Sequence, residues 1–247
     1  MRYVGGKFKL AAKLSEYILA NTIGHREHYL EPFLGSAAVF EKMGPHFAHC
    51  QVGDMHEDLI LMWQATAAGW DPKELDIAVT PEFYALLRRA APSPLRGWAA
   101  FGLSFCGKEW GGFAKADAKR NPQSEARNSV SRAGNLLRSI KDLEIRHCSY
   151  DDWQSPKPGT VVYCDPPYAG TLGYAGTPTF DHVQFWRTMD DWVDQGALVY
   201  VSEYVAPPHW EMVFSVERNL EMSGYNDSQG TNKGSKTRVE RLFTRDA

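Results

Sequence analysis

The chain has 247 residues and a net charge of −3 at pH 7, with 43% hydrophobic and 13% aromatic residues. This composition excludes disordered and collagen-like proteins, and the length suits one large domain or a domain with a sizeable insertion. No apolar run approaches the roughly 18 residues of a membrane span, and the first residues lack the apolar core of a signal peptide. We therefore expect a cytoplasmic protein that makes no membrane contact.

Charge is unevenly distributed along the chain. Residues 106–146 contain nine Lys or Arg against five Asp or Glu, residues 218–247 contain six against four, and residues 147–217 contain two against ten. Two basic segments around an acidic one are typical of a protein with a single nucleic-acid face. Solvated helix surfaces would give the same counts, so charge alone leaves both interpretations open.

The cysteines show no metal-binding pattern. Cys50, Cys106, Cys148 and Cys164 are scattered, without a Cys-x-x-Cys pair or a histidine at zinc-ligand spacing. We expect reduced thiols and no metal site.

The amino-terminal segment places two glycines before a helix. Tyr3-Val4-Gly5-Gly6-Lys7 precedes apolar residues at positions 10, 14 and 18, which indicate a helix. Glycine allows the backbone to approach a ligand closely, and the helix amino terminus together with Lys7 favours an anion. A simple turn before a helix is the alternative.

Residues 29–40 predict a short strand, a glycine turn and a helix. Glu31, Phe33, Gly35 and Ser36 lie in this unit, and Ser36 is placed to cap the helix. Such units present backbone amides to a cofactor carboxylate, and the single glycine excludes a dinucleotide fingerprint. An ordinary helix start without a ligand is the alternative.

A second strand over residues 50–54 ends in Asp54, about twenty residues after the glycine turn. A carboxylate at this place accepts the ribose hydroxyls of a nucleoside-containing cofactor. The alternative use of Asp54 is as a helix N-cap.

Residues 56–142 show no strand pattern. Helical runs are predicted at 59–68, 82–91, 94–105 and 129–143, which indicates an inserted helical subdomain. Its loop at 106–115 interleaves Lys108 and Lys115 with Trp110 and Phe113, a mixture suited to phosphates and to base stacking. Alternatively, this loop is an exposed connection whose two aromatic rings enter the core.

The strand pattern returns at 143–148, followed by Ser149 and Tyr150 at its carboxyl edge. The next strand, Val161 to Cys164, suits burial on both faces and ends in Asp165-Pro166-Pro167-Tyr168. The prolines make a stiff, extended turn at a strand end, where open α/β sheets bind ligands. Asp165 and a carbonyl can accept two N–H bonds from a planar amino-bearing ring, on which Tyr168 stacks. An ordinary strand-to-loop corner is the alternative.

The remainder of the chain completes the sheet. A glycine-rich segment at 168–176 suits a mobile lid, a helix is predicted at 181–195, and the strand at 197–203 ends with Ser202 and Glu203 facing the site. Two strands near 212–222 and 238–244 surround a polar loop at 224–236, which is either mobile or a nucleic-acid contact.

Asp165-Pro166-Pro167-Tyr168 resembles the catalytic signature of the S-adenosylmethionine-dependent amino-methyltransferases, and its initial Asp is similar to that of the DNA adenine methyltransferases. Residues 3–7, 29–40, 54 and 224–243 resemble motifs of the same family, and their order is that of the Dam-type enzymes (D12 class, α group). Ala37 stands where many relatives carry the second glycine of Phe-x-Gly-x-Gly. We expect its methyl group to be tolerated while slightly restricting the loop.

The resemblance implies a Rossmann-like α/β methyltransferase fold with a seven-stranded, mostly parallel sheet. Residues 1–58 and 143–247 would form the catalytic domain, and residues 59–142 the helical DNA target-recognition subdomain. The cofactor would be S-adenosyl-L-methionine. The substrate would be an adenine flipped out of double-stranded DNA, whose 6-amino group receives the methyl group. No metal and no obligate protein partner are implied.

The same resemblance assigns catalytic roles to Asp165, Pro166, Pro167 and Tyr168. Cofactor binding is expected of Tyr3, Gly6, Lys7, Glu31, Phe33, Gly35, Ser36, Asp54, Ser149, Tyr150 and Asp165. DNA contact is expected of Lys108, Trp110, Lys115, Asn232, Lys233 and Lys236.

Two alternatives stay open: an RNA adenine methyltransferase, and a catalytically silent DNA-binding relative of the same fold. We expect a prokaryotic or phage-encoded protein that acts either as an orphan enzyme or within a restriction-modification system. The motifs do not specify its target sequence.

Overall fold

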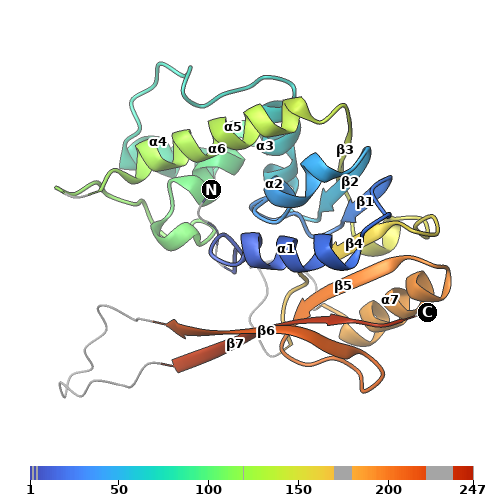
Figure 1. Ribbon diagram of the computed structural model, residues 1–247. Coiled ribbons are helices and arrows are strands. Elements are labelled where there is room, and N and C mark those ends of the chain that lie inside the picture. The colour runs from blue at the N-terminus through green and yellow to red at the C-terminus, as the bar shows by residue number, and fades with distance from the viewer. Residues whose placement is uncertain (2, 4, 119, 170–179, 221–235, 247) are drawn as a thin grey trace, which may run out of the picture.

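The computed structural model describes the chain except for residues 2, 4, 119, 170–179, 221–235 and 247, with the backbone alone at 218–220 and 236–238. Seven strands form one sheet in the order β3-β2-β1-β4-β5-β7-β6 (Figure 1). The strands are β1 (His28–Glu31), β2 (His49–Asp54), β3 (Asp142–His147), β4 (Val161–Cys164), β5 (Leu198–Glu203), β6 (Glu211–Leu220) and β7 (Lys236–Thr244). The first five pair in parallel, whereas β7 runs antiparallel to β5 and β6. The predicted fold class is confirmed.

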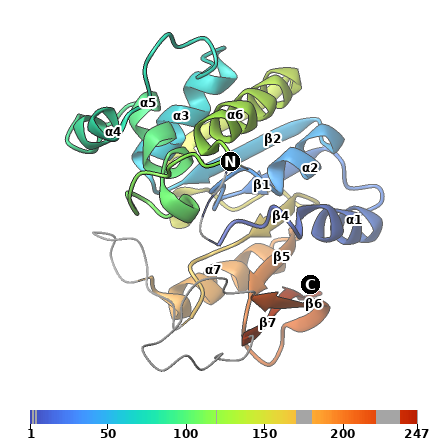
Figure 2. The ribbon, with the colours of Figure 1, turned by 90° about the vertical axis from the view of Figure 1, so that its left-hand side faces the viewer.

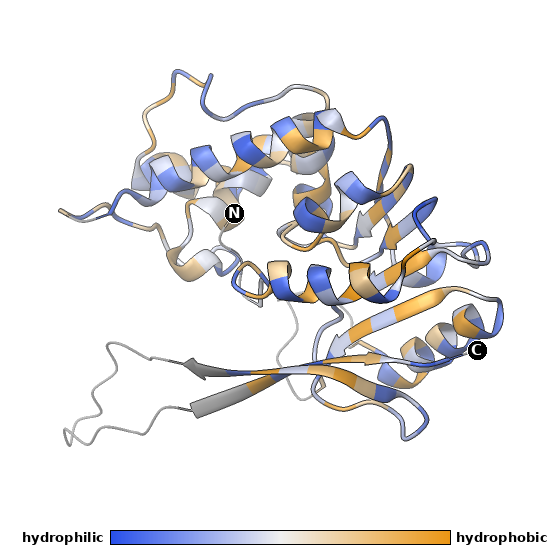
Figure 3. Ribbon diagram, in the orientation of Figure 1, coloured by the Kyte–Doolittle hydropathy of each residue, from blue (hydrophilic) through white to orange (hydrophobic). Residues whose placement is uncertain are grey.

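Helices cover this sheet on both faces. They are α1 (Ala11–Asn21), α2 (Phe40–Met43), α3 (Glu57–Ala67), α4 (Pro81–Arg88), α5 (Pro94–Gly97), α6 (Pro122–Ser139) and α7 (His182–Asp194), with short 3₁₀ turns η1 (Gly44–His46), η3 (Phe105–Gly107) and η4 (Tyr150–Asp152) and a π turn η2 (Trp98–Gly102). Figure 2 shows α1 and α7 on opposite sides of the central strands. Polar and apolar residues alternate along helices such as α1 and α6, as in amphipathic helices (Figure 3).

The pleat of the central strands divides the core into two clusters. In β4, Val161 and Tyr163 join the cluster that contains α1, while Val162 and Cys164 join the cluster that contains α7. Side chains alternate between the faces of a strand, so a strand covered on both faces must be apolar throughout. All four β4 residues have 0% exposure, which confirms the predicted burial of this strand.

The helices between β2 and β3 share the first core cluster with the sheet. Trp63 of α3, Phe101 of η2 and Val130 of α6 belong to the same buried cluster as Tyr163. A Cβ atom on Gly97 would lie 2.1 Å from the carbonyl oxygen of Asp58, so α5 crosses α3 in backbone contact. Among the described residues of this segment, only an isolated bridge between Ser104 and Phe113 has strand pairing.

Two helix boundaries differ from the prediction. The helix predicted at 129–143 is α6, which begins at Pro122 after an Asn121 cap and ends at Ser139. Its first two turns are mostly polar, so apolar periodicity missed them, and the chain then enters β3. The helix predicted at 94–105 has one α turn, α5, before it widens into the π turn η2.

Candidate functional site

Four neighbouring parallel strands end in an acidic residue at the same edge of the sheet. β2, β1 and β5 end on Asp54, Glu31 and Glu203, and Asp165 follows directly after β4. Carboxyl ends of parallel strands meet at one edge, so these four carboxylates form a row along it.

Burial dominates the electrostatics of this acidic row. Burial raises the pKa of Glu31 well above its usual range, although its Oε2 accepts a 2.6 Å hydrogen bond from the Tyr29 hydroxyl. Burial also raises the pKa of Asp165, against the opposing effect of the Lys7 ammonium. Carboxylates desolvated in this way favour a cationic group at the sheet edge.

Lys7 pairs with Asp165 across 158 residues of sequence. Its Nζ lies 2.6 Å from Oδ1 and 2.9 Å from Oδ2 of Asp165, and its side chain is only 4% exposed. The sequence suggested that Lys7 favours an anionic ligand, whereas the structure places the ammonium on the carboxylate of the Asp-Pro-Pro-Tyr segment. A direct cofactor contact from Lys7 stays a prediction.

The glycine turn is held from both sides. The Gly35 N–H donates to Asp54 Oδ2 at 2.9 Å, and the Trp63 indole N–H donates to the Gly35 carbonyl at 3.0 Å. Gly35 has a φ of +47°, and a Cβ atom there would lie 3.3 Å from the Tyr3 ring. Both the positive φ and the close approach of the Tyr3 ring therefore favour glycine at this position.

Ser36 and Ala37 behave differently from expectation. α2 begins at Phe40 with Val39 in the N-cap position, so the prediction that Ser36 caps the helix is wrong. Ser36 instead approaches Gly6, where an added Cβ would lie 3.3 Å from its Oγ. Ala37 has a φ of +59°. A non-glycine residue in this region costs about 1–2 kcal/mol, so the loop retains the left-handed turn at the expense of strain.

Asp54 organises the loop after β2. Its Oδ1 accepts the His56 N–H at 2.9 Å, so both oxygens carry backbone hydrogen bonds. The N-cap of α3 is His56, whose ring accepts the Leu59 N–H, and the N-cap alternative for Asp54 is therefore wrong. The other ring nitrogen of His56 lies 3.1 Å from a Glu109 carboxylate oxygen.

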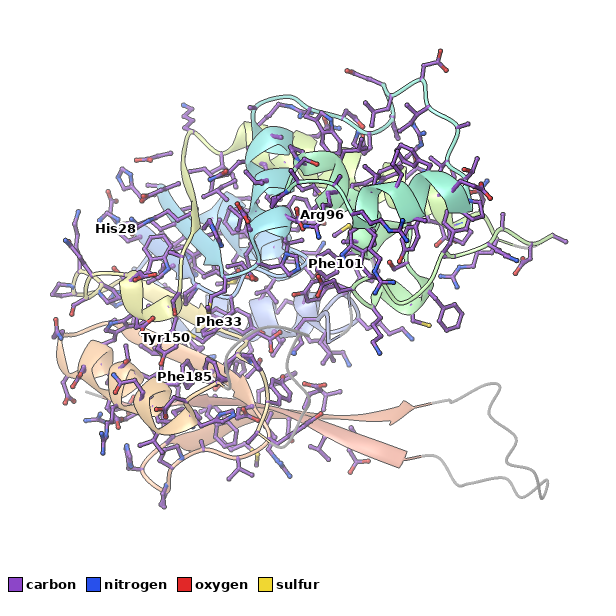
Figure 4. All side chains as sticks on the ribbon, turned by 180° about the vertical axis from the view of Figure 1, so that it is seen from behind. His28, Phe33, Arg96, Phe101, Tyr150 and Phe185 are labelled. Carbon is purple, nitrogen blue, oxygen red and sulfur yellow. The ribbon has the colours of Figure 1, made fainter. Side chains whose placement is uncertain are left out.

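Aromatic side chains gather beside the acidic row. Phe33, which follows β1, stacks on Tyr150, which follows β3, with ring centroids 5.6 Å apart. Phe185 of α7 meets both rings edge-on, and Figure 4 shows the three together. Burial raises the pKa of Tyr150 to about 12. Ser149 caps the η4 turn in a reciprocal pair with Asp152.

Tyr168 is placed by residues that the sequence analysis did not assign. Its hydroxyl donates to Glu240 Oε2 at 2.8 Å, and its ring meets the Tyr204 ring edge-on at 4.6 Å. The Lys7 ammonium lies 4.7 Å from the centroid of the Tyr168 ring. Glu240 comes from β7, and no local sequence pattern predicts the pairing of β7 with β5 that places Glu240 beside Tyr168.

The residues expected to contact DNA have mixed surroundings. Lys108 and Lys115 are exposed. The Trp110 ring packs 5.2 Å from the Tyr84 ring, and the Arg96 guanidinium lies 5.5 Å from its centroid. Asn232 and Lys233 lie outside the described residues, as does most of the expected lid at 168–176, and only the backbone of Lys236 is described. Their roles in DNA binding stay predictions.

A separate hollow of about 580 Å³ is lined by residues of β1, β2 and β3 and of the segment 152–160. His28, Gln51, Glu144 and Arg146 help to line it, and it includes none of the predicted site residues. Figure 4 shows His28 well away from the aromatic group of Phe33 and Tyr150. The candidate site is therefore the acidic edge and not this hollow.

Two features are absent from the described ranges of the chain. No helix there is long and apolar enough to cross a membrane. No group of three or more His, Cys, Asp or Glu side chains there is arranged to hold a metal ion.

Residues 3–84 match the family model of the D12 class N6 adenine-specific DNA methyltransferases. This match confirms the resemblance over the segment that carries Tyr3, Lys7, the glycine turn and Asp54. No curated protein sequence matches the chain.

Solved structures with similar folds include methyltransferases of low sequence identity. An rRNA methylase from Streptococcus thermophilus has 7% identity and a TM-score of 0.41, with 96% of this chain and 97% of that chain covered. The N-methyltransferase NodS from Bradyrhizobium japonicum WM9 has 10% identity and a TM-score of 0.41, with 96% of each chain covered.

Proposed function

We propose that this protein, whose residues 3–84 match the D12 class, is a site-specific DNA-methyltransferase that modifies adenine. The observation that carries the proposal is the position of Asp165-Pro166-Pro167-Tyr168 at the carboxyl end of the central strand β4, within the acidic row. Methyl transfer from S-adenosyl-L-methionine to the 6-amino group of adenine in double-stranded DNA is the reaction that these residues suit.

The chemistry of the sheet edge fits S-adenosylmethionine, which combines cationic groups, a carboxylate and an adenosine. Glu31 and Asp165 place buried carboxyl groups at the sheet edge, and a bound sulfonium or ammonium group would favour their charged forms over the neutral forms that burial favours. A carboxylate has about four acceptor sites, so Asp54 can still accept ribose hydroxyls beside its two backbone hydrogen bonds. Phe33 and Tyr150 offer aromatic faces for the adenine ring of the cofactor.

Asp165 and Pro166 would activate the substrate amino group. The nitrogen lone pair is delocalised into the adenine ring, so the nitrogen is a weak nucleophile. The Asp165 carboxylate and the Pro166 carbonyl would accept its two hydrogens and draw electron density onto the nitrogen. When bound, S-adenosylmethionine supplies an electrophilic methyl group on sulfonium. The consecutive prolines hold both acceptors in one orientation before the substrate arrives.

The target base must leave the helix to reach this site. Adenine stacked in a duplex is inaccessible to a buried carboxylate, so the proposed reaction requires base flipping, with Tyr168 stacking on the extruded ring. The loop after η3 and the strands β6 and β7 extend towards the same side of the molecule (Figure 1). Exposed Lys108 and Lys115, with Phe8 and Phe105 at 65% exposure each, supply groups for phosphates and bases.

The test is transfer of labelled methyl from S-adenosylmethionine to unmethylated duplex DNA, with structured RNA as competitor and the modified base identified by mass spectrometry. We expect N6-methyladenine in DNA at one short sequence. Asp165→Ala should abolish transfer while cofactor binding survives in part, and Asp191→Ala on the exposed surface of α7 should retain normal activity. Transfer to RNA alone would reject the DNA substrate. Cofactor binding without any transfer would favour a silent DNA-binding relative.

A further inference from the structure

Tyr168 is held by contacts from β5 and β7 as well as by its own loop. Glu203, the last residue of β5, accepts the Ala169 N–H at 3.2 Å and so fixes the backbone just after Tyr168. Glu240 of β7 accepts the Tyr168 hydroxyl at 2.8 Å and fixes the other end of the ring. The orientation of the aromatic face therefore depends on the strand that adds to the sheet antiparallel to the others.

The sheet register explains why Glu240 reaches the site. β7 pairs with β5 so that Glu203 lies opposite Arg241, which places Glu240 one residue beyond the carboxyl end of β5. Because β7 runs antiparallel, its amino-terminal half continues past the edge where the parallel strands stop. The Glu240 side chain is 13% exposed there and faces inward.

Further contacts restrict the Tyr168 ring. The Tyr204 ring stands edge-on to it at an interplanar angle of 81°, and the Tyr204 carbonyl accepts a 2.5 Å hydrogen bond from Arg241. The Lys7 ammonium lies 4.7 Å from the Tyr168 ring centroid. Two neighbouring residues of β7 therefore restrict the Tyr168 side chain. Glu240 accepts its hydroxyl directly, and Arg241 acts indirectly by holding Tyr204.

Lys7 creates a conflict that Glu240 can resolve. Both Asp165 oxygens receive the Lys7 ammonium, at 2.6 and 2.9 Å. A substrate amino group can donate to a remaining acceptor site of these oxygens, but the ammonium offsets the charge of the carboxylate and so weakens it as an acceptor for the substrate. Glu240 Oε2 lies 3.7 Å from Lys7 Nζ, close enough to receive the ammonium after a small movement.

We propose that Glu240 is a positioning residue for methyl transfer. It orients Tyr168 through the phenol hydroxyl, and it receives the Lys7 ammonium when the substrate amino group binds Asp165. This inference rests on the proposed function and extends it to a residue outside the Asp-Pro-Pro-Tyr segment. The role assigned to Glu240 is to position Tyr168 and Lys7, with which it has contacts, and not to contact the reacting nitrogen or the methyl group.

The first test is a double-mutant cycle on purified full-length protein. Glu240→Ala and Tyr168→Phe each remove the 2.8 Å hydrogen bond, and Tyr168→Phe also removes a hydrogen bond to Asp165 and should be the slower of the two. Each should lower kcat by about 10- to 100-fold, since a small misplacement of a reacting group has effects of this size. The double variant should be no slower than the slower single variant. Affinity for S-adenosylmethionine should stay within about twofold, because Glu240 lies outside the glycine turn and the aromatic group.

The second test separates the hydrogen bond from the charge. Glu240→Gln keeps an oxygen acceptor for the phenol but loses the charge that receives Lys7. It should recover much of the kcat lost in Glu240→Ala. Its KM for DNA should be higher than that of the wild type, because the ammonium remains on Asp165. Fluorescence of 2-aminopurine at the target position would report whether the base still enters the site.

The control is Glu217→Ala, which removes an exposed glutamate of β6 that pairs opposite Val239, next to Glu240 in β7. It should leave kcat and KM unchanged. Wild-type kinetics in Glu240→Ala or in Glu240→Gln, or losses that simply multiply in the double variant, would overturn the assignment while the proposed function stands. If Glu240→Ala does not fold, Glu240→Gln and Tyr168→Phe still decide the question. A wild-type protein without DNA methylation would reject the proposed function itself.

Discussion

Glu203 should make the stability of this protein depend on pH near neutrality. Its side chain is 1% exposed, and its oxygens accept the Tyr204 N–H at 2.6 Å and the Ala169 N–H at 3.2 Å. Burial raises the pKa of Glu203 from 4.5 to about 7, with a further upward contribution from Asp165. Lys7 opposes this rise, and His182 Nδ1 lies 4.0 Å from Glu203 Oε2.

The sign and size of the effect follow from this pKa. The folded protein binds the Glu203 proton more tightly than the unfolded chain, so the stabilisation is complete below pH 4.5 and is lost as pH rises through 7. At about 1.4 kcal/mol per pH unit, the loss amounts to about 3 kcal/mol. Glu203→Gln removes the titration. It also turns an amide NH₂ towards one of the two backbone N–H donors, at a pH-independent cost of about 1–3 kcal/mol.

The assay is urea unfolding of the wild type and Glu203→Gln at pH values from 5 to 8. We expect the variant to be less stable at pH 5 and the difference to close or reverse by pH 8, a change of about 3 kcal/mol. Other buried acids such as Glu31 and Asp54 cancel in the difference because both proteins contain them. A stability difference that stays constant across this range would refute the reasoning.

Three further predictions concern the scaffold. Gly35→Ala and Gly24→Ala both place a side chain at positive φ, +47° and +92° respectively, so each should cost about 1–2 kcal/mol of stability in thermal unfolding. The new methyl group would lie 3.3 Å from the Tyr3 ring at position 35, whereas it would have no atom within 4 Å at position 24. Only the first should weaken S-adenosylmethionine binding in calorimetry, and equal affinities would contradict the assigned site. Arg127→Met removes hydrogen bonds to three carbonyl groups of the loop between α3 and α4, so limited proteolysis should cut this loop faster, and unchanged cutting would oppose that role. Asp190→Ala removes an acceptor that lies 2.9 Å from Arg245 Nη1, which should cost about 1–3 kcal/mol of stability without lowering kcat, and a loss of kcat would refute a purely structural role.

The strand that carries the candidate active site was predictable because its signals are local. Val161 to Cys164 are apolar at every position, which indicates a strand covered on both faces, and the prolines that follow prevent the strand from continuing. The structure confirms both features, and it also confirms the seven-stranded sheet. Helix α6 was less predictable, since its polar first turns lack the apolar repeat from which helices are identified.

The backbone conformation of the glycine turn could be determined only from the structure. The sequence identifies Gly35 and Ala37 as turn residues, but the positive φ of Ala37 follows from how the loop is tied to β2 and to Trp63. The same constraint moves the helix start to Phe40 and leaves Ser36 without a capping role. A local capping rule fails here because long-range contacts determine the path of the loop.

The sequence by itself determined which residue types end the parallel strands: Glu31, Asp54, Asp165 and Glu203 each follow or close a recognisable apolar run. Only the tertiary structure decided which partners meet them. Lys7 reaches Asp165 across 158 residues, and Glu240 reaches the Tyr168 hydroxyl across 72. Strand order and the antiparallel register of β7 create these contacts, and both are set by packing of the whole sheet, which no short stretch of sequence specifies.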